Sequence, residues 1–128
     1  MGIAGIGIDM VEVARVAAAI ERHGDRFLAR VFTPAEAGYC RSRGVPAQHF
    51  AGRFAVKEAV LKALKTGWGD GILWREVEVS RGPAGEPSVE LSGAAARRAE
   101  KMGIVRIHVS LSHTREHAIA HATAETVE

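Results

Sequence analysis

The sequence predicts an α+β protein in which one long buried helix packs on a small, mainly antiparallel sheet. Residues 48–65 form the longest segment with helical periodicity, and only Gly52 interrupts it with a glycine. Short alternating segments typical of strands occur near both ends of the chain. Helical and strand segments are mixed without regular βαβ units, which favours α+β over a parallel α/β fold.

The first third of the chain is expected to contain one strand and several short helices. Gly2 to Asp9 reads GIAGIGID, which predicts a short buried strand whose glycines let another backbone or a phosphate approach closely. The elements that follow are a helix from Val11 that Gly24 ends or bends, its continuation over 26–32, and a helix that Thr33 caps and that Gly44 and Pro46 close.

The second half is expected to alternate strands with turns. After the long helix we expect a loop with Gly67, Trp68, Gly69 and Gly71, a strand over 75–81, a turn at 82–85, a strand over 87–91, a helix over 93–102, and a hairpin of 105–112 and 118–124 around residues 114–116.

Size and composition indicate a single domain spanning residues 1–128, with a net charge of only +2. The single cysteine, Cys40, excludes an intramolecular disulfide, which suits a reducing cytoplasm. Cys40 is considered as a nucleophile, although its sequence neighbours offer no obvious base. No signal peptide or apolar span is visible, so we predict a cytoplasmic protein with no membrane partner. The isoelectric point near 9.0 permits a nucleic-acid-binding module, but sparse aromatics and the lack of a basic stripe argue against nucleic acid as a partner.

The long helix is apolar almost all round, yet it carries charged residues. Arg53 and Lys57 fall within its large apolar arc, and burying such charges costs several kcal/mol unless a partner in the protein or in a ligand offsets it. Glu58 and Lys62 are spaced i,i+4, which fits a simple ion pair. The alternative is that Glu58 holds a metal while Lys62 faces a phosphate beside it.

Two flanking motifs add candidates. Asp9 follows the first strand, where it either caps the next helix or supplies, with Glu58, a second carboxylate for Mg²⁺. His113 ends the alternating segment His108–His113. It is either a structural residue or a ligand-binding residue. Residues 113–117 also match the H-x-x-E-H zinc signature, which requires a helix where a turn is expected here.

Together the motifs GIGIDMVEVARV (Gly5 to Val16), FAGRFAVKEAVLKAL (Phe50 to Leu64) and HVSLSHTREHAIA (His108 to Ala120) resemble the holo-[acyl-carrier-protein] synthases. These are the short trimeric class of 4′-phosphopantetheinyl transferases. The three motifs occur in order, and the resemblance spans nearly the whole chain. It implies a 4′-phosphopantetheinyl transferase-like fold and a homotrimer with active sites between neighbours.

The resemblance also implies site residues. It implies Mg²⁺ on Asp9 and Glu58, with Mn²⁺ as a possible substitute, and Glu58 and Lys62 as catalytic residues. Lys62, Arg53 and His113 correspond to coenzyme A ligands, the last two at the nucleotide end that carries the 3′-phosphate. Basic positions that receive an acidic acyl carrier protein correspond to Arg15, Arg26 and Arg30. Some relatives carry an acidic residue directly after the histidine, where this chain has Thr114, so His113 is assigned first as a coenzyme ligand.

The implied reaction is magnesium-dependent transfer of 4′-phosphopantetheine from coenzyme A to a serine of apo-acyl carrier protein, with release of adenosine 3′,5′-bisphosphate. Positioning and charge neutralisation would supply most of the catalysis. Glu58, a metal-bound water or a group on the carrier are alternatives for taking the serine proton. The choice between a fatty-acid and a polyketide carrier stays open, as does tolerance for acylated coenzyme A. A structural subunit without metal or coenzyme is the remaining alternative.

Overall fold

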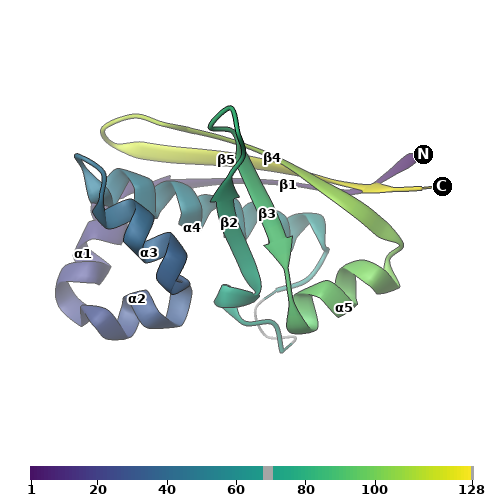
Figure 1. The fold of residues 1–128 in the computed structure, drawn as a ribbon, viewed down its shortest axis with the longest axis horizontal. Coiled ribbons are helices and arrows are strands. Elements are labelled where there is room, and N and C mark those ends of the chain that lie inside the picture. Colours follow the sequence, from purple (N-terminus) through teal and green to yellow (C-terminus); the bar gives the residue numbers. More distant parts are fainter. Residues whose placement is uncertain (68–70, 128) are drawn as a thin grey trace.

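The computed structural model describes residues 1–67 and 71–127, and its architecture is α+β as predicted. Helix α4 (Pro46–Ala63) runs through the middle of the molecule (Figure 1). An antiparallel sheet covers one side of it, with the strand order β1 (Gly2–Glu12), β5 (His117–Thr126) and β4 (Ile104–His113). Strands β2 (Val77–Arg81) and β3 (Pro87–Leu91) form a separate hairpin that crosses α4 on another side.

The remaining helices divide between the two ends of α4. The first three surround its N-terminal half, where their apolar side chains form one core cluster with Phe50 and Ala51. A second cluster joins the C-terminal half of α4 to β2, β5 and the last helix. These helices are α1 (Val13–His23), α2 (Asp25–Val31), α3 (Pro34–Arg41), the short 3₁₀ turn η2 (Trp74–Glu76) and α5 (Gly93–Lys101).

Strand β1 is longer than predicted, and this excludes a helix-capping role for Asp9. The ladder with β5 continues to the pair Glu12 and His117, so α1 begins at Val13 rather than at Val11. Asp9 lies within the ladder opposite Ala120, three residues before the N-cap Glu12. The interpretation of Asp9 as a helix cap is therefore wrong, and its carboxylate is available for other contacts.

In β1 the glycines face the protein interior and the large apolar side chains face outward, which is the reverse of a usual buried strand. Gly5 and Gly7 face α4, and a Cβ on either residue would collide with a carbonyl oxygen of that helix. Ile3, Ile6 and Ile8 point the other way and are 57–65 % exposed. The prediction of a buried strand is wrong for these side chains, because only residues without a Cβ fit against the helix backbone. The glycines allow a second backbone, rather than a phosphate, to approach.

Most expected boundaries lie within two or three residues of the observed ones. Pro46 occupies the first turn of α4 instead of closing the preceding helix, as suits a residue without a backbone N–H. Thr33 caps α3 in a capping box with Glu36, which confirms the predicted cap. The expected strand over 75–81 begins only at Val77, because residues 74–76 form η2. The expected glycine loop includes residues 68–70, which lie outside the described residues.

Lys57 has its partner inside the chain. Its ammonium lies 2.9 Å from the Glu36 carboxylate, both side chains are fully buried, and Lys57 also donates to the carbonyl oxygens of Trp74 and Val77. Glu36 accepts a hydrogen bond from the Val79 amide as well. Of the two alternatives for Lys57, a partner in the protein or in a ligand, the structure therefore shows the first. The pair ties α3 and α4 to β2.

Candidate active site

A cavity of about 590 Å³ lies where β1 passes into α1. Asp9 enters it from β1 and Glu58 from α4, so the strand–helix packing at Gly5 and Gly7 brings these two carboxylates to one space. Arg15 of α1 lines the same cavity. The remaining lining is largely apolar and includes Phe27 and Phe54. We call this space the carboxylate cavity.

Lys62 joins this group through β1. Its ammonium lies 3.2 Å from Asp9 Oδ1 and donates to the carbonyl oxygen of Ile8 at 2.8 Å. The side chain of Lys62 is about half exposed, whereas that of Asp9 is only 17 % exposed. The structure thus brings Asp9, Glu58 and Lys62 close together, as the sequence motifs predict, and places the Lys62 cation beside Asp9.

The side chains of the carboxylate cavity fit Mg²⁺ better than they fit a metal ion whose ligands all come from the protein. Asp9 and Glu58 line one space. Within the described ranges there is no group of three or more His, Cys, Asp or Glu residues that could hold a metal. Mg²⁺ commonly binds one or two carboxylates and completes its shell with water and substrate phosphates. Asp9 and Glu58 beside an open cavity match that pattern, and Glu12 is a third carboxylate in the lining.

A second cavity, of about 210 Å³, contains Arg53 and His113. The structure therefore unites these two predicted coenzyme ligands, but in a space whose lining does not include Asp9 or Glu58. Tyr39, His49 and Arg81 line it too, and the sequence analysis missed all three. His49 lies one helical turn before Arg53, a spacing that would have pointed to it. We call this space the arginine–histidine pocket.

Arg53 is the most constrained cation of the arginine–histidine pocket. It is 5 % exposed, and its guanidinium carbon lies 4.1 Å above the centre of the Tyr39 ring. Its Nε atom is buried and has no hydrogen-bond partner among the described residues. A buried guanidinium nitrogen without a partner is costly, and an anionic ligand would satisfy it.

Cys40 does not have the properties of a nucleophile. Its side chain is fully buried, and burial is the main cause that raises the pKa of its thiol to about 11. The thiolate is the reactive form, so this cysteine is almost entirely protonated near neutral pH. The alternative of a cysteine nucleophile is therefore excluded, and Cys40 belongs to the core.

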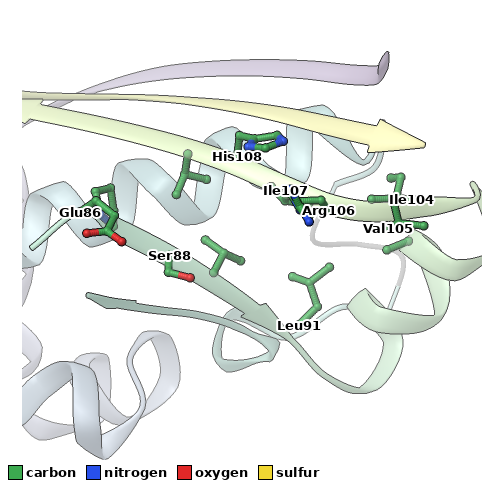
Figure 2. A pocket seen from close by; sticks show the side chains of 12 residues that line it. Glu86, Ser88, Leu91, Ile104, Val105, Arg106, Ile107 and His108 are labelled. Atoms are coloured by element: carbon green, nitrogen blue, oxygen red, sulfur yellow. The ribbon is translucent and has the colours of Figure 1, made fainter. Parts of the chain in front are cut away.

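A third cavity, of about 580 Å³, is a groove between β3 and β4 (Figure 2). Side chains of Ser88 and Leu91 on β3 and of residues 104–108 on β4 lie along it. Pro87 lines both this groove and the arginine–histidine pocket. None of the predicted site residues lines the groove.

The predicted carrier-binding arginines are all exposed. Arg15 lies on α1, whereas Arg26 and Arg30 lie on α2 beyond the break at Gly24, rather than on one continuous helix. Because Arg15 and the α2 residue Phe27 line the carboxylate cavity, α1 and α2 both border that cavity.

Residues 113–117 form a hairpin turn. His113 ends β4 and His117 begins β5, so the helix that the zinc signature requires is absent from this described segment. Thr114 stabilises the turn, because its backbone N–H donates to the His117 carbonyl at 2.8 Å and its hydroxyl accepts from the Glu116 and His117 amides. The zinc-peptidase alternative therefore has no support in this geometry.

On an α+β frame the structure thus places Asp9 and Glu58 at one cavity, with Lys62 paired to Asp9, and Arg53 in a second cavity. Such groups suit a phosphorylated substrate. Residues 5–122 match the family model of the 4′-phosphopantetheinyl transferase superfamily, and the chain belongs to this family. A holo-[acyl-carrier-protein] synthase of Koribacter versatilis is 48 % identical over 123 residues, which are 96 % of this chain and 98 % of that protein.

Solved structures agree with this assignment. The crystal structure of the synthase from Neisseria meningitidis has a TM-score of 0.89 and 31 % identity, and the match covers 98 % of this chain and 100 % of that one. The Helicobacter pylori synthase in complex with coenzyme A has a TM-score of 0.83 and 32 % identity, with 94 % of this chain and 99 % of that one covered. In the part of the chain that the structure describes, no helix meets the length and hydropathy needed to cross a bilayer.

Proposed function

We propose that residues 1–128 form a single-domain holo-[acyl-carrier-protein] synthase that uses Mg²⁺. The reaction of this family transfers 4′-phosphopantetheine from coenzyme A to a serine of apo-acyl carrier protein, and adenosine 3′,5′-bisphosphate leaves. The observation that carries the proposal is the convergence of Asp9 from β1 and Glu58 from α4 on one cavity. Family membership and the coenzyme A complex of a relative support it.

Asp9 and Glu58 would hold the metal, and Mn²⁺ has the same preference for oxygen ligands. Mg²⁺ bound there supplies positive charge to the pyrophosphate of coenzyme A. Lys62 bonds Asp9 and the Ile8 carbonyl in the free protein, and in the complex its ammonium is expected to add positive charge to the same phosphates. Glu58, a metal-bound water and a group on the carrier are the three candidates for taking the serine proton.

Arg53 and His113 are proposed to hold the nucleotide end of coenzyme A. The partnerless Nε of Arg53 and the cationic lining of the arginine–histidine pocket support an anionic ligand there. A guanidinium held flat against an aromatic ring is well suited to bind phosphate oxygens in a fixed direction.

The carrier protein is proposed to dock on the exposed arginines of α1 and α2. Arg15 lines the carboxylate cavity, so a carrier bound at Arg15, Arg26 and Arg30 would have its serine close to that cavity. An acidic carrier would be steered to this surface, and the association rate would fall as the salt concentration rises.

A homotrimer with active sites between neighbours is proposed on two grounds. The carboxylate cavity and the arginine–histidine pocket are separate spaces in one chain, so a neighbour would have to bring them together around one coenzyme A. In addition, Ile6, Ile8 and Met10 project from the outer face of the sheet, each 57–66 % exposed. Side by side on one strand, they form an apolar surface that a neighbouring copy would cover.

The decisive experiment is intact-mass spectrometry of apo-acyl carrier protein after incubation with this protein, coenzyme A and Mg²⁺, with a chelated control. A metal-dependent gain of one phosphopantetheine is expected. Parallel reactions with fatty-acid and polyketide carriers determine carrier preference. A cytoplasmic location follows from the proposed substrates, and cell fractionation would test it. No gain of mass on any carrier would contradict the proposed function.

A further inference from the structure

Three aromatic rings form a column in the arginine–histidine pocket. The Tyr39 ring packs edge-to-face on the His49 ring at 5.8 Å between centroids, and His49 packs in the same way on His113 at 5.1 Å. The column joins α3, α4 and β4. His49 is its middle member and is only partly exposed, and it lines the pocket together with its two neighbours.

Cations surround this column. The guanidinium groups of Arg43, Arg53 and Arg81 lie 5.4, 4.1 and 5.1 Å from the centre of the Tyr39 ring. None of the described residues that line the pocket is acidic. The column therefore lies in a concentration of positive charge that the lining side chains do not neutralise.

The surroundings of His49 hold it neutral in the absence of a ligand. Burial lowers the pKa of His49, and the charges of His113 on β4, Arg53 on α4, Arg43 after α3 and Arg81 on β2 lower it further. A phosphate monoester bound among these arginines would bring up to about two negative charges close to the His49 ring. Opposite charge nearby favours the protonated imidazole.

We propose that His49 is a further recognition residue for the nucleotide end of coenzyme A, and that it takes up a proton from solvent when the 3′-phosphate binds. The inference rests on the proposed function of this pocket and adds a residue and a proton linkage to it. The protonated imidazole has two N–H donors, so it adds a charge-assisted hydrogen bond to the phosphate that the neutral ring of the empty pocket does not supply. Nucleotide affinity therefore rises as pH falls through neutrality.

Calorimetric titration of the full chain with adenosine 3′,5′-bisphosphate tests this, at several pH values and in buffers of different ionisation enthalpy. The dependence of the observed heat on the buffer gives the number of protons taken up. His49→Phe keeps a ring in the column without a titrating group, and His49→Gln keeps polarity. Comparison with wild type at each pH cancels the protonation of the phosphate itself. Adenosine 5′-monophosphate serves as the probe without a 3′-phosphate.

Wild type is expected to take up a fraction of a proton per bound bisphosphate near neutral pH, and both variants are expected to lose that uptake. Wild-type affinity for the bisphosphate is expected to rise about tenfold between high and low pH relative to the affinity of the variants. Unchanged uptake in folded His49→Phe and His49→Gln would overturn the role of His49 alone. Equal affinity of wild type for the bisphosphate and the monophosphate would overturn 3′-phosphate recognition in the pocket, while carrier modification by mass spectrometry would still report the transferase activity independently.

Discussion

Replacing Gly7 with alanine should separate β1 from α4 and damage both the stability of the fold and the proposed metal site. A Cβ at Gly7 would collide with the Ala59 carbonyl oxygen and lie 2.8 Å from the carbonyl carbon and 2.9 Å from Lys62 Cβ. The first two are atoms of the helix backbone, which cannot rotate away as a side-chain end can. Strand β1 and helix α4 must therefore move apart, and the surfaces of small residues that pack between them become exposed.

The expected cost is large for a single methyl group. Overpacking in a close-packed core costs about 1–3 kcal/mol when side chains can adjust, so a collision with backbone should cost about 3 kcal/mol or more. Gly38→Ala is a matched control, because nothing lies within 4 Å of a Cβ there. In the α3 helix that change should be neutral or stabilise by up to about 1 kcal/mol. Gly52→Ala, whose Cβ meets only the flexible end of Leu111 at 2.9 Å, should fall between them.

Urea unfolding followed by circular dichroism measures the three costs, and carrier modification with titrated Mg²⁺ measures function. Because β1 carries Asp9, Gly7→Ala should also raise the Mg²⁺ concentration needed for half-maximal rate. A cost of Gly7→Ala below that of Gly52→Ala would refute the close strand–helix contact. Normal Mg²⁺ dependence in a destabilised Gly7→Ala protein would refute its link to the metal site.

Four further predictions, made with five substitutions, have defined outcomes. Lys57→Met leaves a fully buried carboxylate without its cation and should cost about 3–5 kcal/mol in urea unfolding; a loss below about 1 kcal/mol would contradict a tight buried pair. The pKa of Cys40 is raised from 9.0 to about 11, so the contribution of its protonated thiol to stability should be complete below pH 9.0 and lost as pH rises through about 11. In unfolding experiments at a series of pH values, Cys40→Ala should abolish this loss of stability. Glu58→Gln should lower kcat by about 10²-fold or more, whereas Arg15→Ala should lower kcat/KM for the carrier at low salt. Equal losses of turnover in the two variants that vanish at saturating carrier would overturn the Glu58 assignment. Ile8→Glu should convert the proposed trimer to smaller species in analytical ultracentrifugation, and an unchanged sedimentation coefficient would argue against an interface on this face.

The helices and strands were largely predictable because each has a strong local signal. The long helix, the capped helix after Thr33 and the C-terminal hairpin all follow from periodicity and turn residues. The grouping of Asp9 with Glu58 and Lys62 was one alternative drawn from the residues and was also implied by the motif resemblance, and the structure brings the three close together.

What sequence could not supply were contacts between distant segments. Glu36 and Lys57 are 21 positions apart, and nothing local indicates that they pair. The arginine–histidine pocket draws Tyr39, Arg81 and His113 from three elements, so only the tertiary fold reveals them as neighbours. The exposure of the β1 isoleucines was missed. An alternating Gly–Ile pattern shows that glycines lie on one face of the strand and isoleucines on the other, but it does not show which face packs against the helix.

The position of β5 has a consequence for how the chain acquires its site. Residues 117–126 form the central strand, between β1 at the start of the chain and β4, and Gly2 pairs with Thr126. On the ribosome, β1 therefore has no hydrogen-bonded neighbour until almost the whole sequence has emerged. Pairing of such distant segments is slow, and an unpaired, isoleucine-rich strand is prone to aggregation while it waits. Synthesis of the last strand is thus the event that fixes Asp9 in place, and premature termination before residue 117 should yield a chain without the proposed metal site.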